Sequence, residues 1–296
     1  MVKMIGNKTT YSEKIGIALI YILLTAFSMT IIYPFLNIIA RAFSGYVANT
    51  TGNVFFWPVD FQIHSMKTVL MNSQFGKSFF VSSSVTVMGT ILTIFVSGLG
   101  AYALSRKRLV ARRFLTACFV FTMMFSGGMV PTYIVVRLLG MLNTLWALFV
   151  PGAVSVYNML ILKSAFEGVP VSLEESAKID GASNFVIFCR IALPVIKPTL
   201  AAVSLFLLVG FWNEYWSAIL YITKNDYKPI QLYLLDIISY TADPLNSGID
   251  VSLDLTDSPQ GIRAATIIAS TFPILAVYPF LQKYFVKGVL LGSIKE

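Results

Sequence analysis

Charged side chains are scarce in this chain. Only 12% of its 296 residues are Asp, Glu, Lys or Arg, whereas 56% are hydrophobic and the mean hydropathy is +0.75. A soluble domain carries about 25% charged residues, so a chain this poor in charge cannot cover an aqueous surface. The composition therefore excludes an ordinary soluble enzyme or binding domain and predicts an all-α protein embedded in a membrane.

The residues of metal, thiol and nucleotide chemistry are also few. His64 is the one histidine, and Cys118 and Cys189 are too few for a disulfide scaffold or a zinc site. Gly76-Lys77-Ser78 looks like the end of a P-loop, but Met71 stands where the first glycine is required. We therefore expect no metal site, no nucleotide site and no cofactor bound by this chain.

Long apolar stretches account for most of the chain. A membrane-spanning helix needs about 20 apolar residues, and six stretches approach this length, at residues 15–40, 78–104, 114–138, 144–163, 198–220 and 264–286. The first is too long for the core of a signal peptide and lacks a small-residue cleavage site, so it should remain as a helix, with Pro34 kinking or ending it. The sequence thus predicts a domain of six transmembrane helices over residues 15–286.

The net charge of +8 is explained by orientation and not by nucleic-acid binding. If the N-terminus is inside, 15 Lys and Arg residues lie on the inner side and 7 on the outer side. Inner loops carry the excess of positive charge, so we predict a multi-pass membrane protein with both termini cytoplasmic. The inner segments then include 1–14, the basic cluster from Arg106 to Arg113, 164–197 and 287–296, and the outer loops include 41–77 and 221–263.

Two spans carry features that suggest close packing or a transport path. The second is dense in Ser, Thr and Gly, which let helices approach closely in lipid. The third is interrupted by Ser126-Gly127-Gly128 and Pro131, and a broken backbone at membrane depth is tolerated only against protein or a wet cavity. Either interpretation accounts for both features.

The loop between the fourth and fifth spans contains its own folding signals. Ser172 and Glu175 form a capping box that predicts a helix from Leu173. Gly181 is suited to end that helix in a left-handed turn. Ser183 or Asn184 can cap a second helix, and a later proline, Pro194, can redirect the chain into the fifth span. These signals predict a helix, a tight turn and another helix across the cytoplasmic face.

This loop has the character of a docking element. Ser176 and Ala177 are small, so a partner surface can approach the first helix closely. Glu175 and Gly181 could serve only as helix caps, but those roles are compatible with docking. The spacing continues through Ile191-Ala192-Leu193-Pro194, which a capping box alone does not explain.

The segment Glu174 to Pro198, with Trp212-Asn213 downstream, resembles the permeases of carbohydrate-type, binding-protein-dependent ABC importers. The resemblance covers essentially the whole chain and is nearest to permeases for oligosaccharides and polysaccharide fragments. It departs at Ser176, where alanine is commonest, although a small residue is kept. It implies a type I importer permease with a coupling loop that contacts an ATPase through Glu174, Glu175, Ser176, Ala177, Asp180, Gly181, Leu193 and Pro194.

The same resemblance implies a place in a bacterial cytoplasmic (inner) membrane, and it also implies the partners. They are a second, related permease chain, two cytoplasmic ATPase subunits that use ATP and Mg²⁺, an extracytoplasmic sugar-binding protein and the lipid bilayer. Glu175, Ala177 and Gly181 would seat in a cleft of the ATPase. This chain would then be half of a transport pore and not an enzyme.

Glu214 is the main candidate for the substrate pathway, because a charge within a span is costly and usually faces the interior. Helical spacing places Gly210, Glu214 and Ser217 on one stripe with Asn213 beside it, and the full stripe is Ser204, Leu207, Gly210, Glu214, Ser217 and Tyr221. Trp212 and Trp216 fall on the opposite side. Trp212, Tyr215 and Trp216 could instead form an interfacial aromatic belt, with Glu214 hydrated or paired nearby. Tyr157 and Asn158 in the fourth span are further candidates.

Two other functions remain open from the residues alone. A secondary transporter driven by an ion gradient would need inverted repeats and buried ionisable relays, for which only Glu214 is available. A membrane-embedded enzyme acting on a lipid-linked sugar would need clustered carboxylates, a metal set or an activated nucleophile. The acidic last outer loop is its best support, although it lacks a calcium-binding pattern. The sequence does not name the sugar.

Overall fold

The computed structural model describes residues 11–242 and 258–293, in which the regular elements are helices and the only β-type pairing is an isolated bridge between Ser44 and Phe61. The chain divides into two units, Met1–Leu70 with Ile237–Ala269, and Met71–Asp236 with Ser270–Glu296. α3 (His64–Met71), α14 (Ile230–Ala242) and α15 (Pro259–Ser293) each begin in one unit and end in the other.

In the first unit, α1 (Tyr11–Ala42) runs through Pro34, so this proline does not end the helix. The segment after α1 contains α2 (Tyr46–Thr50) and folds back onto α1, because the Asn37 side chain donates to the carbonyls of Val54 and Phe55, each at 2.9 Å. Ala40, Ala48 and Val54 form a small buried cluster there. The predicted outer loop 41–77 is therefore an ordered segment with short helices.

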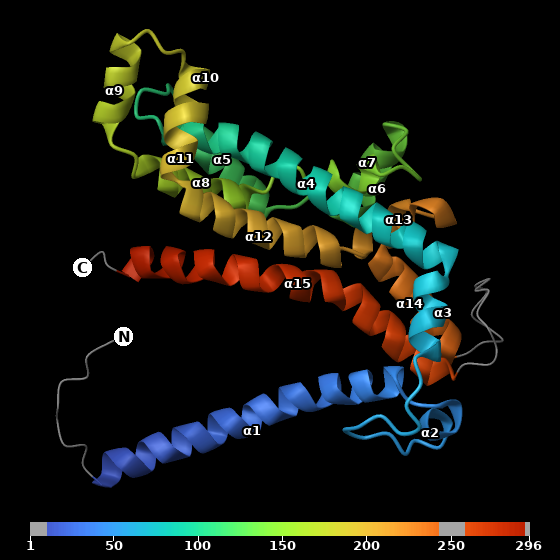
Figure 1. Cartoon of the computed structure of the whole chain (residues 1–296). Helices are drawn as coiled ribbons and strands as arrows, with labels where there is room; N and C mark the ends of the chain where they lie inside the picture. The colour runs from blue at the N-terminus through green and yellow to red at the C-terminus, as the bar shows by residue number, and fades with distance from the viewer. Residues whose placement is uncertain (1–10, 243–257, 294–296) are drawn as a thin grey trace. The chain divides into compact units, whose positions relative to one another are not determined.

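In the second unit, α4 (Ser73–Ser105) lies beside α8 (Val156–Glu167) and α12 (Lys197–Asn213) (Figure 1). Asn72 caps α4, since its side-chain oxygen accepts from the N–H groups of Gln74 and Phe75. The small residues of α4 face its neighbours: a Cβ added at Gly89 would lie 2.9 Å from the Phe211 ring. This contact supports the packing interpretation of the small residues in the second span.

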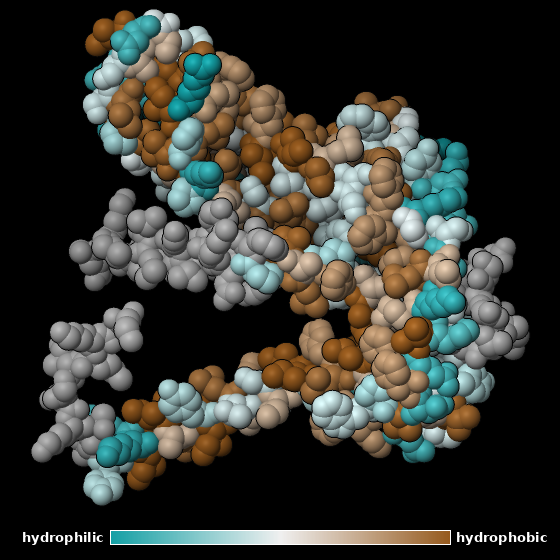
Figure 2. Space-filling view, in the orientation of Figure 1, coloured by the Kyte–Doolittle hydropathy of each residue, from teal (hydrophilic) through white to brown (hydrophobic). Residues whose placement is uncertain are grey.

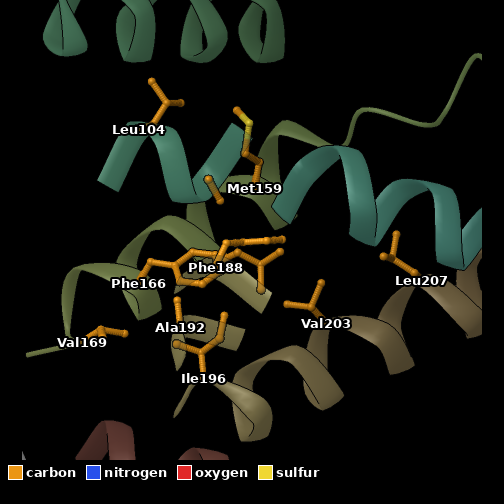
Figure 3. Packing of buried hydrophobic residues seen from close by; sticks show 11 residues of the cluster. Leu104, Met159, Phe166, Val169, Phe188, Ala192, Ile196, Val203 and Leu207 are labelled. Carbon is orange, nitrogen blue, oxygen red and sulfur yellow. The ribbon is translucent and has the colours of Figure 1, made fainter. Parts of the chain in front are cut away.

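An apolar cluster joins these three helices at one end of the unit. Figure 3 shows Phe166 of α8 and Phe188 at its centre, with Leu104 of α4 and Val203 and Leu207 of α12 around them. The complete cluster of buried residues is Ala101, Leu104, Met159, Leu162, Phe166, Val169, Phe188, Ala192, Ile196, Val203 and Leu207. The segment that follows α8 is therefore anchored to the three helices, because its residues Val169, Phe188 and Ala192 are part of this cluster.

The outer surface is apolar over long stretches, as a bilayer requires. Many large hydrophobic side chains of α1 are exposed, including Leu23 and Phe27, and Figure 2 shows hydrophobic surface along this helix. Within the described residues, three helices are long and apolar enough to cross a membrane, in the ranges Glu13–Ala42, Ser73–Ser105 and Pro259–Val277. The count rises to five if each of two bent helix pairs is a single span.

The third and fourth predicted spans are both interrupted. The break expected at Ser126-Gly127-Gly128 is confirmed: α5 (Arg112–Met124) and α6 (Met129–Leu138) meet at 107°, with Gly128 at φ +88°. The continuous helix expected over 144–163 is not formed, because only α7 (Trp146–Phe149) precedes α8. Pro151-Gly152 lies in the gap, and neither residue favours a helix interior.

The fifth predicted span also differs from a straight helix. α12 ends at Asn213, and α13 (Trp216–Tyr221) begins after a break at Glu214 and Tyr215. The first, second and sixth predicted spans are confirmed as the long helices α1, α4 and α15. The structure therefore gives three uninterrupted long helices and several broken ones, and does not confirm the predicted count of six.

Candidate functional site

The predicted coupling loop folds as α9 (Val171–Ile179), a tight turn, α10 (Asn184–Ile187), a π-helical turn (Phe188–Ala192) and α11 (Leu193–Val195). In Figure 1, α9 and α10 lie at one end of the bundle of α4, α8 and α12. The predicted capping box is not formed, because Pro170 occupies the N-cap position and Ser172 lies inside the helix. A proline needs no N–H partner at a helix start and has a suitable φ, so α9 begins earlier than predicted.

The end of α9 and the start of α10 are as predicted. Gly181 has φ +81°, and the N–H of Ala182 donates to the carbonyl of Ala177 at 2.9 Å. Such a left-handed glycine satisfies the last carbonyls of a helix. The hydroxyl of Ser183 accepts from the N–H of Val186 at 3.4 Å and caps α10.

The chain turns toward α12 later than the sequence suggested. The 85° bend lies at Ile196, between Val195 and Lys197, and not at Pro194. Pro198 explains the position, because it has no N–H to donate to the carbonyl of Pro194. Leu193 is half-buried at this bend and Pro194 is exposed.

The predicted coupling residues do not share one surface. Glu175, Ser176, Asp180 and Gly181 are exposed, whereas Glu174 is only 4% exposed and Ala177 is buried. Apolar side chains are exposed beside them, with Ile179 at 87% and Phe185 at 59%. The outward face of the loop therefore combines a free carboxylate with apolar side chains, which suits a protein surface more than water alone.

Glu174 points back toward the bundle and forms an ion pair with Arg106. Arg106 follows the last residue of α4, and its second terminal nitrogen donates to the carbonyl of Phe166 at 3.3 Å. Its guanidinium carbon lies 4.4 Å from the ring centroid of Tyr102. The sequence counts Arg106 only among the orientation charges, and no local signal pairs it with Glu174, which lies 68 residues away.

A second ion-pair cluster stands beside the first. Arg112 and Lys163 both donate to Glu167, the latter at 2.9 Å. A cavity of about 330 Å³ lies between the two clusters and is also lined by Lys107, Arg108 and Lys178. The base of the loop is thus held by charges on α5, α8 and α9 and by Arg106 in the segment between α4 and α5.

The candidate pathway stripe on the fifth span is not formed. Glu214 has extended backbone angles, and its carboxylate accepts from the N–H of Ser217 at 3.0 Å, which caps α13. Because the helix breaks here, Glu214, Ser217 and Tyr221 do not continue the face of Ser204, Leu207 and Gly210. The helical spacing assumed an unbroken span, and that assumption was wrong.

The other polar candidates are placed as follows. Asn213 ends α12 and accepts from the Gln231 side chain at 3.4 Å, and Gly210 is exposed. Tyr157 is exposed, whereas Asn158 is buried and donates to the hydroxyl of Ser155 at 2.9 Å. The structure brings Asn213, Glu214 and Ser217 together through the break between α12 and α13, and records no contact between this group and Tyr157 or Asn158 among the described residues.

Trp212 does not belong to an exposed aromatic belt. It is 6% exposed, and its indole N–H donates to the carbonyl of Ser270 in α15 at 3.1 Å. Trp216 remains exposed on α13. The expectation that both tryptophans share one face is wrong for the same reason as the stripe, since the backbone breaks between them.

Asn143 is a structural residue that the sequence analysis missed. It has φ +58°, and its side-chain oxygen accepts from the N–H groups of Thr223 and Lys224 at 2.7 and 3.0 Å. It thereby joins the segment before α7 to the segment after α13. The signal in the sequence is the residue type, because Asn adopts positive φ more readily than most residues. Gly140, three residues earlier, also has positive φ.

The segment after α13 is also joined to the start of α4. Lys77 donates to Asp226 at 2.7 Å, and this bond and the lysine charge hold the pKa of Asp226 below its usual value. No group of three or more His, Cys, Asp and Glu side chains in residues 11–242 and 258–293 is arranged to hold a metal. Most of the acidic residues of the last predicted outer loop, Asp243, Asp250, Asp254 and Asp257, lie outside the described residues.

A family model described as binding-protein-dependent transport system inner membrane component matches residues 91–291. The chain is 41% identical over 277 residues to the polygalacturonan/rhamnogalacturonan transport system permease protein YtcP of Bacillus subtilis, covering 94% of this chain and 97% of that protein. It is 42% identical over 264 residues to protein LplC of the same bacterium, covering 89% of each.

A solved structure has the same fold. A chain in the crystal structure of a bacterial ABC transporter involved in the import of the acidic polysaccharide alginate superposes with a TM-score of 0.86. That chain is 29% identical in sequence, and the match covers 95% of this chain and 100% of that one.

Proposed function

The chain belongs to the family of binding-protein-dependent transport system inner membrane components, and from this premise we propose that it forms half of an import pore driven by a separate ATPase. Its fold is the all-helical type I ABC permease fold, and it is a multi-pass membrane subunit of a carbohydrate importer. As a permease it carries out transport and is not itself an enzyme.

The observation that carries the coupling proposal is the outward face of α9. Glu175 is exposed one residue from the buried Glu174, and Ile179 and Phe185 expose apolar surface beside it. Exposed apolar side chains around a few polar groups are typical of a protein–protein contact. The partner that fits is a cytoplasmic ATPase, which would use ATP and Mg²⁺.

The remaining partners follow from the same proposal. A second, related permease chain would complete the pore, and a second ATPase subunit would complete the motor. An extracytoplasmic binding protein would deliver the sugar. With both termini in the cytoplasm, α9 faces the ATPases, and the segment after α13 faces the binding protein.

The proposed substrate is an oligosaccharide or a polysaccharide fragment. The names of the similar proteins support this class, because they refer to polygalacturonan, rhamnogalacturonan and the acidic polysaccharide alginate. Sugars are bound through aromatic faces and hydrogen-bonding groups. The candidates for lining the path remain Tyr157, Asn158, Gly210, Asn213, Glu214 and Ser217.

The first experiment is purification of the tagged chain from its native host in mild detergent, with mass spectrometry of the proteins that accompany it. We expect an ATPase, a second permease and a sugar-binding protein. A stable chain that purifies alone would favour a secondary transporter and contradict the proposal.

The coupling role is tested by Glu175→Arg in the purified complex. We expect sugar uptake into proteoliposomes to fall about tenfold or more, because one buried charge reversal at an interface costs several kcal/mol. Ser176→Ala in the same helix is the matched control and should transport normally, since a small residue is kept. Normal transport-linked ATP hydrolysis in Glu175→Arg would overturn the coupling assignment.

A further inference from the structure

Glu174 and Glu175 are adjacent in α9 but have opposite environments. We infer that Glu174 is a positioning residue: it fixes α9 to the cytoplasmic end of α4 through Arg106, so that movement of α9 is passed to α4. In this inference Glu174 does not contact the ATPase, whereas Glu175 does. This inference rests on the proposed function, in which α9 receives the movement of the ATPase.

The Glu174 side chain is buried, and the Arg106 side chain is mostly buried. The side chains of Arg106 and Glu174 are 14% and 6% exposed. A buried ion pair adds little net stability, but removing one partner leaves an uncompensated buried charge at a high cost. Orientations of α9 that separate the two groups are therefore strongly disfavoured, and the pair holds α9 at one angle to α4.

Arg106 is itself fixed on three sides. Its guanidinium group lies over Tyr102 and donates to the carbonyl of Phe166, in addition to its bond with Glu174. The ring of Tyr102 contacts Phe166 edge-on, at 5.4 Å between centroids, and lies 5.2 Å from Phe188. One guanidinium group thus joins the last turn of α4, the last turn of α8 and the first turns of α9 to the apolar cluster of Figure 3.

The neighbouring ion pair provides a contrast. The side chains of Arg112 and Glu167 are 27% and 35% exposed, and solvent weakens an ion pair at such exposure. Glu167 lies on α8 and pairs with Arg112 of α5 and with Lys163 of α8 itself, so the loss of its charge removes no contact of α9. Glu167→Gln is therefore a matched control for Glu174→Gln, with the same chemical change in the next pair along the surface.

The inference is tested by a distance measurement on the full chain in nanodiscs. Spin labels are attached at Ile179→Cys on α9 and Met88→Cys on α4, both exposed, after Cys118 and Cys189 are replaced by serine. We expect Glu174→Gln to broaden the distance distribution, and Glu167→Gln to leave it unchanged. Arg106→Lys keeps the positive charge but loses the planar fork, so it should broaden the distribution less. An unchanged distribution in Glu174→Gln would overturn the inference.

A functional measurement separates this inference from the proposed function. In the whole complex, Glu174→Gln should lower sugar uptake about tenfold while ATP hydrolysis falls less than twofold, because the motor still binds and only transmission is lost. Loss of ATPase binding in Glu174→Gln without a change of distance would make Glu174 a direct contact and overturn the inference. If Glu175→Arg transports normally, the proposed function fails, whereas the distance result still stands.

Discussion

Single residues in this protein owe their properties to the elements packed around them. Tyr233 on α14 is 3% exposed, its ring lies 6.1 Å from that of Phe75, and its hydroxyl has no hydrogen-bond partner among the described residues. Burial, followed by the nearby charge of Asp236, raises the pKa of Tyr233 to about 12. The phenol is therefore kept neutral by its surroundings well above the pH at which a free tyrosine ionises.

This shift predicts a loss of stability at alkaline pH. Below pH 10 the phenol of Tyr233 is protonated in both the folded and the unfolded chain. Its ionisation then does not lower the free energy of unfolding. Between pH 10 and about 12 only the unfolded chain ionises, and the folded state loses about 2 kcal/mol. Unfolding of the wild type and Tyr233→Phe in detergent, compared across this range, should show a loss about 2 kcal/mol larger in the wild type.

The same substitution has a second expected outcome at neutral pH. Removing a buried hydroxyl without a partner is neutral or stabilising, so Tyr233→Phe should unfold at the same temperature as the wild type or slightly higher. A marked destabilisation at pH 7 would show that the hydroxyl has a partner.

Among the elements, α4 decides how closely the helices of the second unit approach. Gly89 faces Phe211 of α12 and Phe149 of α7, and an added Cβ would lie 2.9 and 3.0 Å from their atoms. Gly76 near the start of the same helix has nothing within 4 Å of an added Cβ. The helix packing therefore leaves no room for a side chain at Gly89 but leaves room for one at Gly76.

The difference predicts opposite effects of the same substitution. Gly89→Ala should destabilise the protein by about 1–3 kcal/mol, because a well-packed interior does not accept an extra carbon without strain. Gly76→Ala should stabilise by up to about 1 kcal/mol, since alanine restricts the unfolded chain and the helix accepts it. Thermal unfolding in detergent measures both, and equal effects of the two changes would contradict this account of the packing.

At the scale of the whole molecule, orientation in the membrane follows from the distribution of charge. Lys and Arg are concentrated in the segments predicted to be cytoplasmic, including the cluster at Arg106 and Arg112 beneath the coupling loop. Because positive loops stay on the inner side, we expect α9 and α10 inside and the segment with Asp226 outside.

Orientation is tested by labelling with a membrane-impermeant thiol reagent. In a Cys118→Ser background, the exposed Cys189 should react in inverted membrane vesicles but not in intact cells. Asp226→Cys in a background without other cysteines should react from outside only. Labelling of Cys189 in intact cells would reverse the assigned topology and remove the coupling loop from the ATPases.

The sequence by itself determined the class of protein and the local shape of the coupling loop. Hydropathy acts along the chain, so composition alone predicts membrane helices, and the long helices α1, α4 and α15 were found where expected. Gly181 and Ser183 act through bonds to residues within five positions, so they predicted the turn and the second cap. The start of α9 was misplaced because Pro170 and Ser172 were both acceptable local choices.

Only the tertiary structure decided which side chains face inward and where the spans break. Glu174 and Glu175 have the same chemistry, and the ion pair of Glu174 with Arg106, 68 residues away, gives the two side chains different environments. The break at Glu214 likewise could not be derived from helical spacing, because no proline or glycine marks it and its cap on Ser217 exists only once the chain has turned. Hydropathy and turn chemistry are properties of neighbours in sequence, whereas burial and ion pairing depend on neighbours in space.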